Sequence, residues 1–320
     1  MSRIKPFVFY LHISILLTFA IEQAQGQKLK VFILAGQSNM EGQGVVDLDH
    51  PEYYNGGKGT LQHVMNKTAD KTVFAHVKDE EGQWTVRDDV WVRFRTTHEL
   101  KKGPLSIGFA GYPGRHHIGP EFQFGHVVGD KLEDHVLLIK TAWGGKSLYK
   151  DFRPPSAGGQ CGEYYKKMIA EVRRGLDKIA SDFPDLANSK VEIAGFVWFQ
   201  GWNDMFDDTA LKEYESNLIC LANDVRKEFD NAKLPIVIGE LGNGGANAGE
   251  NMKRIRSAQK AAADHFGQRG NVRFVKTTDF ARPKEESPNV GHGHHWFGNA
   301  ESYFLIGDAL GKEMLTMINR

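Results

Sequence analysis

Residues 28–40 read KLKVFILAGQSNM, and this stretch decides the fold. Its apolar part ends at Gly36, and the polar residues Gln37, Ser38 and Asn39 follow at once, which is typical of a buried strand that leads into a loop. Further apolar runs of the same character lie at 135–140, 191–199, 234–239 and 272–276. The sequence therefore predicts a series of short buried strands, and polar, glycine-containing segments follow several of them.

Amphipathic segments separate these runs. Apolar residues recur at helical spacing within 162–180, 208–229, 251–266 and 299–318. Strands that alternate with helices form a parallel sheet with helices on both faces, so the sequence predicts an α/β fold. Residues 44–118 break the alternation and contain a stretch of alternating character from Trp84 to Arg95. We expect 44–118 to be an excursion of short antiparallel strands and loops inside the same domain.

The composition excludes several classes of protein. With 320 residues, 25% charged and 41% hydrophobic, the chain is globular rather than disordered, collagen-like or a multi-span membrane protein. Lys+Arg and Asp+Glu balance at 40 each, so the basic excess expected of a nucleic-acid-binding protein is missing. No glycine-rich phosphate loop follows a predicted strand. Cys161 and Cys220 are too few for a disulfide scaffold, and they form either one bridge or two buried thiols.

The N-terminus has the three parts of a secretory signal peptide. Arg3 and Lys5 precede an apolar stretch at 7–20, and the small-residue triplet Ala-Gln-Gly ends at position 26. A membrane anchor is the weaker interpretation, because a span needs about 20 apolar residues. We therefore expect residues 1–26 to be a signal peptide and 27–320 to be one domain. The mature protein is then secreted or periplasmic, with no membrane span after the signal is removed.

Polar clusters follow three of the predicted strands, at 36–40, 143–147 and 200–204, and a fourth at 291–295 precedes the last helix. Ligands of open parallel sheets bind at the carboxyl ends of the strands. A serine in a strand-to-helix turn, glycine and asparagine loops, and a late histidine are the groups that acyl transfer needs. Each cluster alone also has a plainer interpretation as a helix cap, a turn, a backbone kink or a histidine metal site.

The clusters together resemble a known family. VFILAGQSNMEG at 31–42 is similar to the first block of the SGNH (GDSL-like) hydrolases, in the branch of sialate O-acetylesterases and the acetylxylan esterases of carbohydrate esterase family 6. Supporting segments are GPEFQFG (119–125), KTAWGGKSL (140–148), DFRPPS (151–156), WFQGWND (198–204) and HHWFGNAESYFLIGDALG (294–311). The resemblance implies a flavodoxin-like three-layer α/β/α sandwich and a serine esterase that removes acetyl groups from carbohydrate without a cofactor or metal. Its substrate would be sialic acid or an acetylated polysaccharide such as xylan.

The resemblance also implies roles for individual residues. Ser38 matches the nucleophile, and its backbone N–H would be one donor to the oxyanion. Gly145 matches the second block's backbone donor, and Asn203 fits the side-chain donor. Gln200 is a competing or additional donor, because nearer relatives often carry Gln-Gly-Glu at this place. His295 matches the general base.

One position departs from the family pattern. The family usually has an aspartate three residues before the catalytic histidine, and this chain has His292 there. An imidazole does not supply the negative charge that stabilises an imidazolium. The acid then comes from Glu286, Glu285 or Asp279, of which we favour Glu286. The alternative is a Ser-His dyad in which a backbone carbonyl orients His295.

Two residues are candidates for substrate binding. Arg153 can reach a substrate carboxylate or sugar hydroxyls, or it pins its own loop. Trp202 can stack on a sugar ring. Two other functions remain as alternatives: a non-catalytic carbohydrate-binding protein on the same fold, and a metal-dependent hydrolase that uses His292, His294 and His295.

Overall fold

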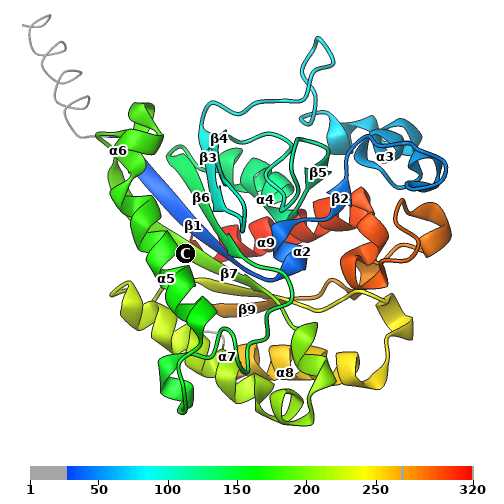
Figure 1. The fold of residues 1–320 in the computed structure, drawn as a ribbon. Helices are drawn as coiled ribbons and strands as arrows, with labels where there is room; N and C mark the ends of the chain where they lie inside the picture. Colours follow the sequence, from blue (N-terminus) through cyan, green and yellow to red (C-terminus); the bar gives the residue numbers. More distant parts are fainter. Residues whose placement is uncertain (1–26, 268–269, 319–320) are drawn as a thin grey trace, which may run out of the picture.

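A computed structural model describes residues 27–267 and 270–318 (Figure 1). The expected signal peptide, residues 1–26, lies outside the described residues. Within them, a seven-stranded sheet has the order β4-β3-β6-β1-β7-β8-β9. Its strands are β1 (Lys28–Gly36), β3 (Val90–Arg95), β4 (Leu100–Pro104), β6 (His135–Ala142), β7 (Lys190–Phe199), β8 (Ile236–Gly239) and β9 (Val272–Val275). Neighbouring strands are parallel except β3 and β4, which are antiparallel.

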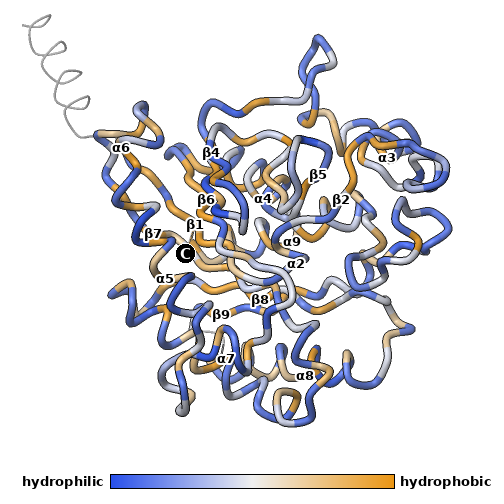
Figure 2. Tube along the Cα trace, in the orientation of Figure 1, coloured by the Kyte–Doolittle hydropathy of each residue, from blue (hydrophilic) through white to orange (hydrophobic). Residues whose placement is uncertain are grey.

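Strand β1 occupies the middle of the sheet because its side chains are apolar on both faces. Val31 and Ile33 join one hydrophobic cluster, and Phe32 and Leu34 join the other, which is the two-residue alternation of a strand buried on both sides. Figure 2 shows hydrophobic residues gathered on the central strands. The expected parallel sheet is confirmed.

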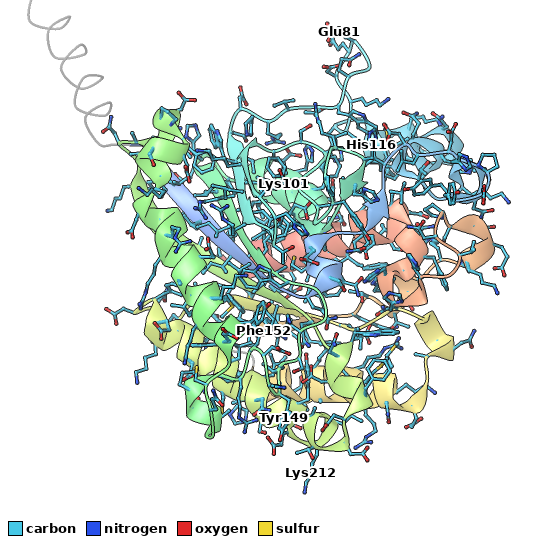
Figure 3. All side chains as sticks on the ribbon, in the orientation of Figure 1. Glu81, Lys101, His116, Tyr149, Phe152 and Lys212 are labelled. Carbon is cyan, nitrogen blue, oxygen red and sulfur yellow. The ribbon has the colours of Figure 1, made fainter. Side chains whose placement is uncertain are left out.

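Helices cover both faces of the sheet (Figure 1). Helices α5 (Glu163–Asp177), α7 (Asp208–Glu228) and α8 (Glu250–His265) pack on one face, while α4 (Pro120–Gly129) and α9 (Ala300–Ile318) pack together on the other. Figure 3 adds the side chains: Phe152, which is fully buried, lies inside the molecule, and the exposed Lys212 points outward from α7. The structure is therefore a three-layer α/β/α sandwich, as the sequence predicts.

The excursion at 44–118 differs from its prediction. Within the excursion, β2 (Gly44–Val45) and β5 (His117–Ile118) form a separate antiparallel pair, an isolated antiparallel bridge joins Lys78 to Trp84, and helix α3 (Leu61–Lys67) lies between β2 and that bridge in the sequence. Strand β3 instead joins the main sheet, parallel to β6, and β4 covers its edge. The charged residue Arg93 made β3 look like a strand with one exposed face. In the structure Arg93 is only 2% exposed, because its guanidinium donates to Asp182 at 3.0 Å.

Strand register brings the predicted site together. Gly36 at the end of β1 pairs with Ala142 in β6 and with Phe199 in β7. The polar loops that follow these three strands therefore start at the same level of the sheet. Cys161 and Cys220 are both free thiols, so the bridged alternative is not formed. In the part of the chain that the structure describes, no helix is both long enough and apolar enough to cross a bilayer.

Candidate active site

The loops after β1, β6 and β7 and the segment before α9 surround a pocket of about 480 Å³. Five residues singled out from the sequence line it: Ser38, Gly145, Trp202, Asn203 and His295. They come from four separate places in the chain. The pocket lies at the carboxyl end of the parallel sheet, where ligands of such sheets bind.

Ser38 stands at the first turn beyond the sheet. Gly36 allows this turn, because a Cβ there would lie 2.2 Å from the carbonyl oxygen of Phe199 in the neighbouring strand. The chain then enters the short helix α2 (Ser38–Glu41), with Ser38 as its first residue. Gln43 Nε2 donates to the Ser38 carbonyl at 3.1 Å. These contacts fix a serine that is 9% exposed at the pocket.

Gln37 orients the Asn203 side chain. Gln37 Nε2 donates to Asn203 Oδ1 at 3.1 Å, and Gln37 Oε1 accepts from the backbone N–H of Gly201 at 3.2 Å. Because the oxygen of the Asn203 amide is engaged with Gln37, its Nδ2 is left to donate into the pocket. Gln37, the buried residue before the serine, thus orients the side chain of Asn203, which lies 166 positions later in the sequence.

The turn after β6 provides backbone donors. Gly145 has a φ of +70°, in the left-handed region that favours glycine, and an added Cβ would meet nothing within 4 Å. The Gly144 N–H instead faces the Glu41 carboxylate. Among the described residues, the Gly145 N–H has no hydrogen-bond partner. Gly145 is therefore the glycine of this turn whose donor is available to a ligand.

Asp204 ties this turn to the loop after β7. Its carboxylate accepts from the backbone N–H groups of Leu148 at 2.9 Å and Tyr149 at 2.8 Å. Burial raises the pKa of Asp204 to about 6. The sequence analysis missed this role, although Asp204 stands directly beside Asn203 in the motif.

Gln200 lies behind the pocket wall rather than in it. Its Nε2 donates to Asp204 at 2.6 Å and to the Lys146 carbonyl at 2.9 Å, and its Oε1 accepts from Tyr214 at 3.0 Å. Both hydrogens of the amide are thereby used to join the two loops. This geometry favours Asn203 over Gln200 as the side-chain donor.

The segment that carries His295 is tied to the residue after Ser38. Asn39 Nδ2 donates to the His294 carbonyl at 3.1 Å, and Asn243 Nδ2 donates to the same oxygen at 2.8 Å. The Tyr303 hydroxyl contacts both Asn39 Oδ1, at 2.7 Å, and the His295 carbonyl, at 3.3 Å. Asn39 and Tyr303 belong to motifs quoted above, but Asn243 lies in a loop that the sequence did not single out.

The His295 ring is held in its neutral form. Burial, followed by the neighbouring His294 and His292, lowers the pKa of His295 to about 3. Its Nδ1 is buried without a hydrogen-bond partner in the described chain. No hydrogen bond joins His295 to Ser38 among the described residues, and such bonds often form only when substrate is bound. Trp296 and Phe297 follow with φ of 52° and 54°, a strained conformation that is common beside functional sites.

Comparison with known proteins identifies the family of this chain. The family model "Carbohydrate esterase, sialic acid-specific acetylesterase" matches residues 28–316. The chain belongs to this family. A probable carbohydrate esterase of Arabidopsis thaliana is 24% identical over 234 residues, which cover 72% of this chain and 74% of the relative.

Solved structures are similar in fold. A protein of Arabidopsis thaliana has a TM-score of 0.56 at 18% identity, covering 91% of this chain and 98% of its own. A carbohydrate acetylesterase from Xanthomonas citri has a TM-score of 0.49 at 15% identity, covering 88% of this chain and 56% of its own. The match with a TM-score of 0.56 agrees with the expected fold, and the family model shows the expected family.

The structure does not bring Glu286 to His295. Glu286 lines a different pocket, together with Lys58 and His63, and no acid bonds His295 Nδ1 in the described chain. Asn299 Nδ2 donates to the Glu286 carbonyl at 3.3 Å, which anchors the backbone of this turn. The expectation that Glu286 orients the base is corrected.

The other two acids have partners of their own. Glu285 faces Lys284 at 3.9 Å, and Asp279 pairs with Lys276 at 3.0 Å. The site therefore presents a serine and a histidine without a contacting acid among the described residues.

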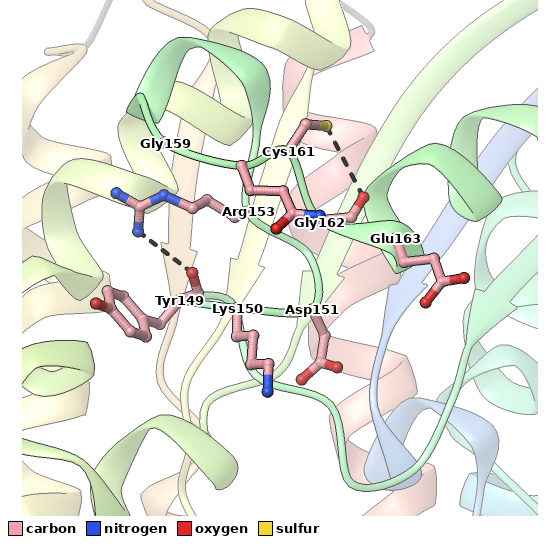
Figure 4. A pocket seen from close by; sticks show the side chains of 9 residues that line it. Tyr149, Lys150, Asp151, Arg153, Gly159, Cys161, Gly162 and Glu163 are labelled. Atoms are coloured by element: carbon pink, nitrogen blue, oxygen red, sulfur yellow. Dashed lines mark hydrogen bonds between the residues drawn. The ribbon is translucent and has the colours of Figure 1, made fainter.

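Arg153 belongs to a second pocket, of about 430 Å³ (Figure 4). Its guanidinium donates to the carbonyls of Tyr149, Ala157 and Gly158 at 2.7–3.2 Å and to Glu213 at 3.1 Å. These bonds pin its own loop. The structure thus supports the loop-pinning interpretation and not a contact with substrate in the Ser38 pocket.

Aromatic side chains form one wall of the Ser38 pocket. The Trp202 ring lies 5.9 Å from Phe206 and 5.7 Å from His294. Phe206 is 70% exposed, which is unusual for so large an apolar side chain. The sequence analysis missed Phe206, although it lies four residues after Trp202.

The histidines are not arranged as a metal site. The centroids of His292 and His294 are 5.6 Å apart, and those of His294 and His295 are 4.0 Å apart. Within the described residues, no group of three or more His, Cys, Asp and Glu side chains is placed to hold a metal ion. This geometry does not support the metal-dependent alternative.

Proposed function

We propose that this family member is a serine esterase that hydrolyses O-acetyl esters on carbohydrate. The observation that carries the proposal is the meeting of Ser38, His295, Gly145 and Asn203 in one pocket. These four provide a nucleophile, a base that is neutral at physiological pH, and two donors for an oxyanion. The family description supports an acetylated carbohydrate as substrate.

In the acylation step, His295 removes the proton from Ser38 Oγ while the oxygen attacks the acetyl carbonyl. The tetrahedral oxyanion accepts hydrogen bonds from the N–H groups of Ser38 and Gly145 and from Asn203 Nδ2. His295 then returns the proton to the sugar oxygen as the C–O bond breaks, and the free hydroxyl of the sugar leaves. Acetyl-Ser38 remains.

Deacylation repeats these steps with water. His295 takes a proton from water, the hydroxide oxygen attacks the acetyl-serine carbonyl, and acetate leaves as Ser38 regains its proton. Ser38 and His295 act as a dyad in this mechanism, and no carboxylate accepts a hydrogen bond from His295 Nδ1 in the described chain. Its position instead depends on the Asn39 and Asn243 bonds to the preceding carbonyl.

We also propose that residues 1–26 act as a signal peptide and that the enzyme is exported. The support is the basic, apolar and small-residue pattern of the N-terminus. N-terminal sequencing of the protein from culture medium or periplasm should start near Gln27. A chain that keeps residues 1–26 in the cytoplasm would contradict export.

The decisive experiment measures acetate release. Purified protein is tested on p-nitrophenyl acetate, acetylated xylo-oligosaccharide and O-acetyl sialic acid, with and without a chelator, beside the Ser38→Ala variant. We expect release that is insensitive to the chelator and is lost in the variant. Glycan binding without hydrolysis would support the carbohydrate-binding alternative, and loss of activity with the chelator would support a metal enzyme.

A further inference from the structure

Glu41 lies beside the proposed nucleophile and has no role in the chemistry above. It lines the Ser38 pocket from helix α2, three residues after Ser38. A Cβ added to Gly144 would lie 3.1 Å from Glu41 Oε2 and 3.5 Å from Ser38 Cβ. The carboxylate and the serine thus flank the same glycine, close enough for both to face one small ligand.

The backbone of Glu41 is firmly held. Its carbonyl accepts from Lys140 Nζ at 3.0 Å and from the Gly111 N–H at 2.9 Å. Lys140 is fully buried and forms its ion pair with Glu121, at 2.7 Å. Among the described residues, the Glu41 carboxylate forms no direct ion pair; it accepts from the Gly144 N–H, and the charges of Lys140 and Lys167 act on it from farther away.

The other lysines near this region lie outside the pocket lining. Lys167 lies over the Trp143 ring at 4.5 Å, and Lys146 lies over the Tyr164 ring at 4.4 Å. Lys101 donates to loop carbonyls, including that of Gly108 at 2.9 Å. None of these three lysines lines the pocket.

The charge of the pocket lining is consequently negative when Glu41 is ionised. Of the described residues that line it, Glu41 is the only acid, and neither lysine nor arginine is among them. Burial lowers the pKa of His294 and of His295, so both rings are neutral near pH 7. Trp202 and Phe206 offer aromatic faces, which suit the apolar face of a sugar rather than a charged group.

We propose that Glu41 is a specificity-determining residue that makes this site select uncharged acetylated sugars and reject anionic ones such as acetylated sialic acid. The inference rests on the proposed esterase function. A sugar carboxylate brought into this partly buried pocket meets the ionised Glu41, and no lysine or arginine of the described lining is placed to pair with it. The hydroxyls of a neutral sugar can instead donate to the Glu41 carboxylate.

The test compares two substrates that differ in one charge. Acetate release from 9-O-acetyl-N-acetylneuraminic acid is measured against release from the methyl ester of its carboxyl group. Burial raises the pKa of Glu41, so the two rates are compared at rising pH, because ionisation of this carboxylate increases with pH. We expect kcat/KM to be at least about tenfold higher for the methyl ester, and the ratio to fall at higher salt.

The Glu41→Gln variant keeps the size of the side chain and removes its charge. In this variant we expect kcat/KM for the methyl ester to exceed that for the free acid by no more than about threefold. Glu215→Gln is the matched control, because Glu215 is exposed on α7 and outside the pocket, and it should keep the wild-type ratio. Equal rates on both substrates in the wild type, or an unchanged ratio in Glu41→Gln, would overturn the proposal.

The wild-type comparison needs no variant, so it decides the proposal even if Glu41→Gln does not fold. Failure of the esterase function itself has a different signature. In that case neither substrate nor p-nitrophenyl acetate releases acetate above the level of the Ser38→Ala variant.

Discussion

Gln37 Nε2 donates to Asn203 Oδ1 at 3.1 Å, which joins the residue before the serine to the side chain that faces it across the pocket. The contact links the ends of β1 and β7, which are adjacent in the sheet. It gives the Asn203 amide one orientation, with its N–H donors toward the pocket. The oxyanion site is thus oriented by a contact that does not involve substrate.

Asn203→Ala removes this donor. We expect kcat to fall by about 10²–10³ while KM changes much less, because the bond strengthens only as the oxyanion forms. Steady-state kinetics on p-nitrophenyl acetate give both constants. Gln200→Ala is the comparison: its amide joins two loops, so we expect mainly a lower Tm. A large kcat loss in Gln200→Ala with a mild effect in Asn203→Ala would reverse the assignment of the donor.

Glu286→Gln tests the corrected view of the missing acid. Glu286 lines another pocket and does not bond His295, so we expect kcat/KM to stay within about twofold of the wild type. His295→Ala, assayed in parallel, should lose nearly all activity. A drop of about 100-fold or more in Glu286→Gln, roughly 2.7 kcal/mol of transition-state stabilisation, would restore this residue as the triad acid.

The pH dependence of kcat/KM reports on the base. Burial and two neighbouring histidines lower the pKa of His295 to about 3, so the neutral, active form persists well below the ordinary histidine value of 6.5. We expect kcat/KM on a neutral acetyl ester to stay nearly flat from about pH 7 down to about pH 5. Initial rates from short incubations separate this effect from acid unfolding. A midpoint near 6.5 would show that burial does not lower the pKa of the catalytic base.

His126 should make the fold sensitive to acid. Burial lowers its pKa to about 3, and both ring nitrogens lack partners in the described chain. Between pH 6.5 and 3 the unfolded state binds a proton that the folded state does not, so the free energy of unfolding falls as pH falls. His126 alone should contribute a loss of about 2–3 kcal/mol at pH 4.5 relative to pH 7.5.

Urea unfolding at the two pH values measures this loss. His126→Leu should reduce the difference between them, because an apolar side chain cannot take up the proton. His265→Gln, at an exposed position, should leave the difference unchanged. If His126→Leu retains the full wild-type difference, His126 is not a source of the acid sensitivity.

Local patterns were sufficient for most of the fold. The apolar runs at 28–35, 135–140 and 191–199 became three adjacent strands, because such residues are stable only with both faces covered. The place of β3 was missed, since Arg93 is buried by ion pairs with residues that lie far away in the sequence. Pairing of that kind leaves no periodic signal.

The candidate site was also predicted in part. Ser38, Gly145, Asn203 and His295 were predicted because each follows a strand or precedes a helix in a recognisable motif, and in the structure all four line one pocket. The acid was misplaced because sequence separation from His295 says little about distance once a turn is anchored elsewhere, as Asn299 anchors Glu286. The role proposed for Glu41 was missed, because it depends on which charged residues line the same pocket, and local sequence does not predict that.

Labelling of the native protein with a fluorophosphonate, followed by peptide mass mapping, tests the role of Ser38 most directly. A neutral His295 beside the pocket should activate Ser38 toward this reagent. We predict one adduct, on Ser38, that forms with loss of esterase activity, is slowed by acetylated sugar and is absent from His295→Ala. Full activity in a protein without an adduct on Ser38, or an adduct at a different serine that accompanies inactivation, would contradict the account.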